Sequence, residues 1–188
     1  MIDGEEYQIV ISPIGDIEST LSDLISSEVI RIFGLQTGIL PLIDRVDFAF
    51  DPQRRQYYST LILEKLAAAA PFRAVKVLGI TTKDLFIPIL THVYGEAQLG
   101  GKTCIISTCR LDEENPKLRP GNPFHHRAVK EAIHELGHTF KLKHCPERNC
   151  VMHYCRSIAD VDRKTDQLCR HCRVLLADEI RRLGMKEK

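Results

Sequence analysis

A single short stretch of this chain gathers most of the side chains that bind metal ions well. Five of the seven cysteines lie between Cys145 and Cys172, and they directly follow three histidines, His134, His138 and His144. The first residues lack the basic start and apolar run of a signal peptide, so we expect a cytoplasmic protein. In a reducing compartment a cysteine cluster indicates metal ligation more than disulfide bonds. The stretch is therefore predicted to fold around bound metal.

The histidines begin in an H-E-x-x-H motif on a predicted helix of about residues 123–140. His134 and His138 are four residues apart and share one helical face, so both rings can reach one ion. Glu135 lies roughly 100° further round the helix, where it can lean over the open side of the ion. With His144, three protein ligands leave a fourth tetrahedral position for water, which is typical of a catalytic zinc site. The alternative is a set of ordinary surface histidines.

Four of the cysteines form two closely spaced pairs joined by a loop. Neighbouring residues point in different directions, so Cys145 can serve a second metal site while His144 serves the first. Two such pairs are the usual form of a closed, structural four-cysteine zinc site. The predicted ligands are Cys145, Cys150, Cys169 and Cys172. Four reduced, buried thiols are the alternative, and Cys155 and His171 remain as competing ligands.

Hydrophobic periodicity along the chain predicts strands that alternate with helices. Strands are expected at about 7–12, 40–50, 75–80, 86–93 and 103–108, and helices at about 16–33, 54–69, 123–140 and 173–183. Gly34 should end the first helix, and Pro88 would confine its strand to a sheet edge. The glycine-rich residues 95–101 read as a turn and residues 110–123 as a loop. This alternation predicts an α/β sheet.

Composition narrows the classes of partner. The chain has 188 residues, 44% of them hydrophobic, which suits one sizeable core. A formal net charge of +1 gives no reason to expect nucleic acid or an anionic membrane as the main partner. No segment is long and apolar enough to span a bilayer. We expect a monomer that acts on peptides or proteins.

The order of these ligands resembles that of a known family. H-E-x-x-H-x5-H-C, then x4-C-x-M, then C-x-x-C is similar to the pattern of the archaemetzincins, a branch of the metzincin zinc peptidases. The resemblance implies one compact metzincin-like catalytic domain over residues 1–188, with a mixed twisted sheet. Residues 1–141 would form an upper sheet-and-helix part, and residues 142–188 a cysteine-rich lower part with the C-terminal helix. It also implies two zinc ions per chain, one catalytic and one structural.

The resemblance gives roles to two further residues and draws attention to a third. Met152 would be the methionine of the Met-turn beneath the catalytic site, although by itself it reads as a gap-filling core residue. Tyr154 would hydrogen-bond the tetrahedral intermediate, with a purely structural tyrosine as the alternative. Metzincins usually have glycine where this chain has Lys141. A side chain there either tolerates positive φ, at about 1–2 kcal/mol, or the turn is made differently.

The leading hypothesis is zinc-dependent peptide hydrolysis with Glu135 as general base. A strand near residues 93–108 could pair with the substrate backbone as a sheet edge. The alternative is a zinc-stabilised protein- or peptide-binding module with little or no proteolytic activity. A nucleic-acid-binding zinc ribbon is disfavoured by the near-neutral charge. Glu131 is expected to be an exposed helix carboxylate or a hydrogen-bond partner of His134, and the other histidines are expected to be solvated.

Overall fold

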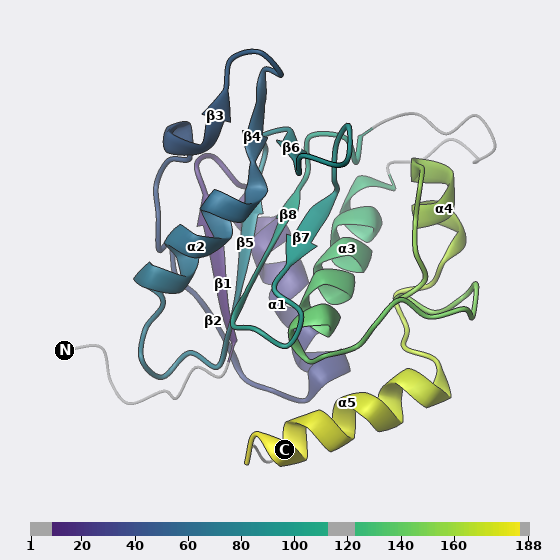
Figure 1. Ribbon diagram of the computed structural model, residues 1–188. Helices are drawn as coiled ribbons and strands as arrows, with labels where there is room; N and C mark the ends of the chain where they lie inside the picture. The colour runs from purple at the N-terminus through teal and green to yellow at the C-terminus, as the bar shows by residue number, and fades with distance from the viewer. Residues whose placement is uncertain (1–8, 113–122, 185–188) are drawn as a thin grey trace.

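The computed structural model describes residues 9–112 and 123–184 (Figure 1). The expected strand residues 7–8 and most of the expected loop 110–123 lie outside this part of the chain. Within the described residues, no helix combines the length and the hydrophobicity needed to cross a membrane.

A five-stranded sheet forms the centre of the fold, in the order β2-β1-β5-β8-β7. Its strands are β1 (Ile9–Ile14), β2 (Thr37–Ile39), β5 (Lys76–Thr81), β7 (Gly95–Ala97) and β8 (Thr103–Ser107). The first four in the order run parallel, whereas β7 pairs antiparallel with β8 at one edge. Every residue of the central strand β5 is buried. The expected mixed sheet is therefore confirmed.

Helices cover both faces of this sheet. The helices α1 (Ser19–Phe33) and α3 (Phe124–Thr139) lie on one face, and α2 (Ser59–Ala69) lies on the other (Figure 1). Side chains of β1 alternate between the two layers: Ile9 and Ile11 join the core of α1 and α3, whereas Val10 joins that of α2. As predicted, α1 ends at Gly34, which takes φ 67°.

A small second sheet stands beside the main one, and the sequence interpretation missed it. It contains β3 (Phe50–Asp51), β4 (Gln56–Tyr58) and β6 (Leu85–Phe86), preceded by a short 3-10 helix, η1 (Asp47–Ala49). The strand predicted at 40–50 is wrong, because Phe48 and Phe50 are about half exposed and their alternation reflects no buried sheet face. The helix predicted from residue 54 begins later, at Ser59, because β4 uses the intervening residues.

The edge of the main sheet also differs from the prediction. Residues 87–94 form a loop, closed by an isolated bridge between Leu85 and Val93, rather than the predicted strand. The edge strand is β7, which lies within the expected glycine-rich turn. A three-residue strand that begins with glycine gives no hydrophobic periodicity to detect.

The C-terminal part contains α4 (Ile158–Arg163) and α5 (Arg170–Arg182), of which only α5 was predicted. A buried ion pair connects α4 to α3: Arg127 Nε donates to Asp162 Oδ1 at 2.7 Å, and the side chains are 2% and 6% exposed. Arg127 also donates to the carbonyl oxygen of Leu111. The pair fastens the C-terminal part to the sheet-bearing part.

We predict that Asp162→Asn lowers the free energy of unfolding by about 3–5 kcal/mol, because it leaves the buried guanidinium of Arg127 without its counter-ion. Urea denaturation of the variant and the parent protein measures the loss. Asp47→Asn is the matched control, since it breaks the exposed pair of Arg45 and Asp47 and should cost less than about 1 kcal/mol. Equal losses in the two variants would contradict this account of the pair.

Candidate metal centres

Three histidine rings converge at the C-terminal half of α3. Their ring centroids are 4.7 Å apart for His134 and His138, 4.9 Å for His138 and His144, and 5.4 Å for His134 and His144. Their nearest ring nitrogens all lie within 4.8 Å of one another. The structure therefore brings together the three histidines that the sequence spacing singled out.

Hydrogen bonds on the far side of two of these rings fix their orientation. His134 Nδ1 lies 2.8 Å from the carbonyl oxygen of Val151, and His138 Nδ1 lies 2.7 Å from that of Leu142. A carbonyl oxygen only accepts, so each Nδ1 carries the hydrogen and each Nε2 keeps its lone pair. The two Nε2 atoms face each other at 3.1 Å. Ligand histidines are usually held by such a bond on the opposite nitrogen.

The protonation of the three rings suits a metal cation. Burial lowers the pKa of all three imidazoles, and that of His134 falls well below its usual range. Neutral imidazole is the form that binds zinc. Burial and the nearby Glu131 together raise the pKa of Glu135 well above its usual range. The donor set therefore fits a zinc ion next to a carboxyl group that holds a proton readily.

The turn after α3 shows how the chain accommodates Lys141 where metzincins usually have glycine. This residue takes φ 63°, so it adopts the left-handed conformation that glycine would adopt more easily. The amide of Leu142 then donates to the carbonyl oxygen of Gly137, and the chain turns back toward His144. The Lys141 ammonium is paired with the buried carboxylate of Glu179 at 2.6 Å. The chain makes the tight turn with a strained lysine.

We predict that Lys141→Gly is more stable than Lys141→Ala by about 1 kcal/mol or more, because only glycine relieves the positive φ. Both substitutions remove the ion pair with Glu179, so that loss cancels in the comparison. At the exposed helical position Lys65, the alanine variant should instead be more stable than the glycine variant by about 1 kcal/mol. Thermal unfolding of the four variants decides; a more stable Lys141→Ala would show that the turn carries no strain.

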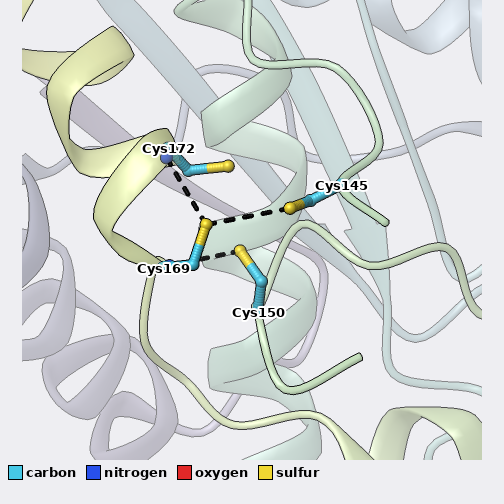
Figure 2. Close-up of side chains that lie close together, drawn as sticks. All are labelled: Cys145, Cys150, Cys169 and Cys172. Atoms are coloured by element: carbon cyan, nitrogen blue, oxygen red, sulfur yellow. Dashed lines mark hydrogen bonds between the residues drawn. The ribbon is translucent and has the colours of Figure 1, made fainter. Parts of the chain in front are cut away.

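The four predicted cysteines also meet. Figure 2 shows their sulfur atoms turned toward a common centre, two from the loop after α3 and two from the start of α5. All four sulfurs lie within 4.8 Å of one another, and Cys145 Sγ is 3.8 Å from Cys169 Sγ. None of them forms a disulfide. Backbone amides of Cys169 and Cys172 point at Cys150 Sγ and Cys169 Sγ, as they would toward thiolates. The cluster fits a closed site for zinc.

The loop after α3 is hydrogen-bonded to the histidine cluster and also carries two of the four cysteines. The amide of Cys145 donates to the carbonyl oxygen of Met152 at 2.9 Å, and Val151 accepts from His134. Met152 is fully buried. A Cβ on Gly137 would lie 2.5 Å from Met152 Sδ, so the glycine of H-E-L-G-H admits the methionine.

A cleft of about 350 Å³ opens over the histidines. Gly95 and Ala97 of β7 line one side, and residues 154–156 line another. A Cβ on Gly95 would lie 2.5 Å from Glu135 Cγ, so this glycine lets the carboxyl group reach its position. The Tyr154 side chain is 44% exposed at the cleft, and its ring centroid is 4.9 Å from that of His144.

One buried pair beside the cleft was missed. Lys164 Nζ lies 2.8 Å from Glu131 Oε1 and 3.5 Å from His134 Nδ1, and the lysine side chain is 0% exposed. Glu131 was expected to be exposed or to bond His134, and it does neither. Burial lowers the pKa of Lys164, but attraction to Glu131, Cys155 and Glu135 together outweighs burial, so the net change is upward. The three-residue spacing between Glu131 and His134 indicated that Glu131 lies near the site. No feature of the sequence indicated the same for Lys164.

The residues that the sequence offered as weaker candidates for metal binding are not members of either cluster. Cys155 lines the cleft but is not part of the sulfur cluster, and His171 is exposed on α5. Burial raises the pKa of the Cys155 thiol to about 11, which keeps it protonated. His92 also lines the cleft, and His153 donates from Nδ1 to the carbonyl oxygen of Cys145.

Comparison with known proteins places the whole arrangement in one group. Residues 2–178 match the profile of Peptidase family M54. The archaemetzincin of Methanocaldococcus jannaschii is 39% identical over 172 residues, which cover 91% of this chain and 93% of that protein.

Solved structures of similar proteins share the fold of this chain. The crystal structure of the archaemetzincin from Methanopyrus kandleri superposes with a TM-score of 0.81 at 31% identity, over 96% of this chain and 99% of that one. A zinc-dependent peptidase from Methanocorpusculum labreanum superposes with a TM-score of 0.79 at 27% identity, over 89% and 99%.

Proposed function

Because this chain belongs to Peptidase family M54 and is a zinc metallopeptidase, we propose that it hydrolyses peptide bonds with Glu135 as the general base. One observation carries the proposal: the Glu135 side chain is buried, lines the same cleft as the three histidines and lies against Gly95. An apolar side chain would pack better at this buried position, so packing alone does not explain a carboxyl group there.

We further propose that the chain holds two zinc ions. His134, His138 and His144 would hold the catalytic ion through Nε2 of at least the first two, since their Nδ1 atoms are engaged by carbonyl oxygens. The four cysteines would hold the structural ion through their sulfurs. Residues 1–141 and 142–188 would be the two parts of one catalytic domain, with the cleft between them.

Zinc held by the three histidines would polarise the scissile carbonyl group and lower the pKa of water to about 7. Glu135 takes a proton from the attacking water onto its carboxylate as the new C–O bond forms. It then delivers that proton to the leaving nitrogen as the C–N bond breaks. The Tyr154 hydroxyl would donate to the developing oxyanion.

The substrate is a peptide or protein, and we propose that β7 aligns it. This strand is the edge of the main sheet, and two of its three residues line the cleft. An extended substrate segment would pair with the open edge of β7 and lie across the histidines. Ile87, Leu90 and Val93 would offer apolar contacts on the same side.

A diverse peptide mixture tests the proposal. The zinc-loaded protein should create new peptide termini by mass spectrometry, whereas Glu135→Ala should create none and still retain its zinc. Equal termini from both proteins would exclude Glu135 as the base. No termini from either would favour a peptide-binding role.

Gly95→Ala should lower kcat by about 100-fold, because a Cβ at this position displaces the Glu135 carboxyl group. Zinc content should stay unchanged, since no ligand is touched. Gly15→Ala is the control: it should cost about 1–2 kcal/mol of stability because Gly15 takes φ 74°, but its Cβ would meet nothing within 4 Å and it lies outside the cleft, so activity should persist. Full activity of Gly95→Ala would show that the close approach of Glu135 to β7 is unimportant.

A further inference from the structure

Two buried ion pairs join α3 to the α4 region with opposite polarity. In the first, α3 supplies the cation Arg127 and α4 supplies the carboxylate Asp162. In the second, α3 supplies the carboxylate Glu131 and Lys164, directly after α4, supplies the cation. If fastening the two helices were the only purpose, either polarity would serve in both places.

The polarity of the second pair places a cation behind a metal-ligating ring. Lys164 Nζ lies 3.5 Å from His134 Nδ1. That contact is no hydrogen bond, because Nδ1 already donates to the carbonyl oxygen of Val151 and an ammonium has only donors. Ligand histidines are usually backed by a carboxylate, a carbonyl oxygen or water. Here His134 Nδ1 has both the carbonyl oxygen of Val151 and the ammonium group of Lys164 nearby.

We infer that the Lys164 ammonium weakens the hold of the histidine site on its metal ion, and that Glu131 limits this effect. The inference rests on the ligand set proposed above. A dication at Nε2 of His134 and the ammonium behind the ring repel each other, and burial leaves little water to screen them. Glu131 Oε1, 2.8 Å from Nζ, offsets part of that repulsion.

The consequence is a difference between the two metal sites. The four-cysteine site has no buried cation in contact with its sulfurs among the described residues, and thiolates themselves carry negative charge. The histidine site has neutral ligands and Lys164 behind one of them. The catalytic ion should therefore exchange with free metal much more readily than the structural ion, at a rate that the Lys164 and Glu131 pair governs.

Chelator competition on the full-length protein tests this inference. Zinc retained per chain is measured as the chelator concentration rises, so that the cysteine site serves as an internal reference. Lys164→Met keeps the stem and removes the charge, and it should tighten zinc at the histidine site by about 10-fold or more. Glu131→Gln removes the carboxylate that is paired with the ammonium and should weaken zinc binding at the histidine site by about 10- to 100-fold.

The other ion pair provides the control. Asp162→Asn breaks a buried pair in the same helix interface without touching His134, so it should destabilise the fold and leave zinc affinity unchanged. If Glu131→Gln does not fold, the reversed pair Glu131→Lys with Lys164→Glu replaces it and should tighten zinc.

Unchanged or weaker zinc binding in Lys164→Met would overturn the inference. So would a loss of affinity in Asp162→Asn as large as that in Glu131→Gln, because it would show that both pairs act only by fastening helices. A parent protein that binds a single zinc ion would instead contradict the proposed ligand set. The two failures are therefore distinguishable.

Discussion

The hydrogen bond from His134 Nδ1 to the carbonyl oxygen of Val151 connects the sheet-bearing residues of this protein to its C-terminal residues at the histidine cluster. It ties the active-site helix α3 to a loop that also carries the third histidine and half of the cysteine cluster. In the same loop, the amide of Cys145 donates to the carbonyl oxygen of Met152. The histidine cluster and the cysteine cluster therefore share one hydrogen-bonded loop.

With the proposed ligands, the C-terminal part, residues 142–188, would depend on bound metal for part of its stability. Of its elements, α4 is only six residues long, and α5 buries a single narrow face. An ion held by the four thiolates would add to the stability that its buried side chains supply. It would also fix the position of Cys145, which follows His144 in the chain, so the cysteine cluster would support the histidine cluster through a single peptide bond.

Sequence reasoning located both clusters because their members are close together in the chain, so local geometry alone brings them near one another. Two histidines one helical turn apart meet whatever surrounds the helix, and closely spaced cysteine pairs converge for similar reasons. The main helices were also predicted, since α1 and α3 bury one regular face each. The departure at Lys141 proved to be a strained turn of the usual kind.

What sequence reasoning missed depends on contacts between distant segments. The strand β7 is held by its pairing with β8 and gives no periodic signal. The alternation of Phe48 and Phe50 was misread as a strand, because Phe48 lies in η1, Phe50 begins β3 and both side chains are about half exposed. The pairing of Lys164 with Glu131 joins residues on either side of the cysteine-rich loop, and no local pattern marks either as buried.

The central claim is that one short segment builds two adjacent metal sites with separate ligands. Anomalous X-ray diffraction from crystals of the protein, measured on both sides of the zinc absorption edge, tests it most directly. The account predicts two zinc peaks per chain. One should lie about 2.0–2.1 Å from the nitrogens of His134, His138 and His144, and the other about 2.3 Å from the four sulfurs. A single peak, or a peak ligated by Cys155 or His171, would contradict it.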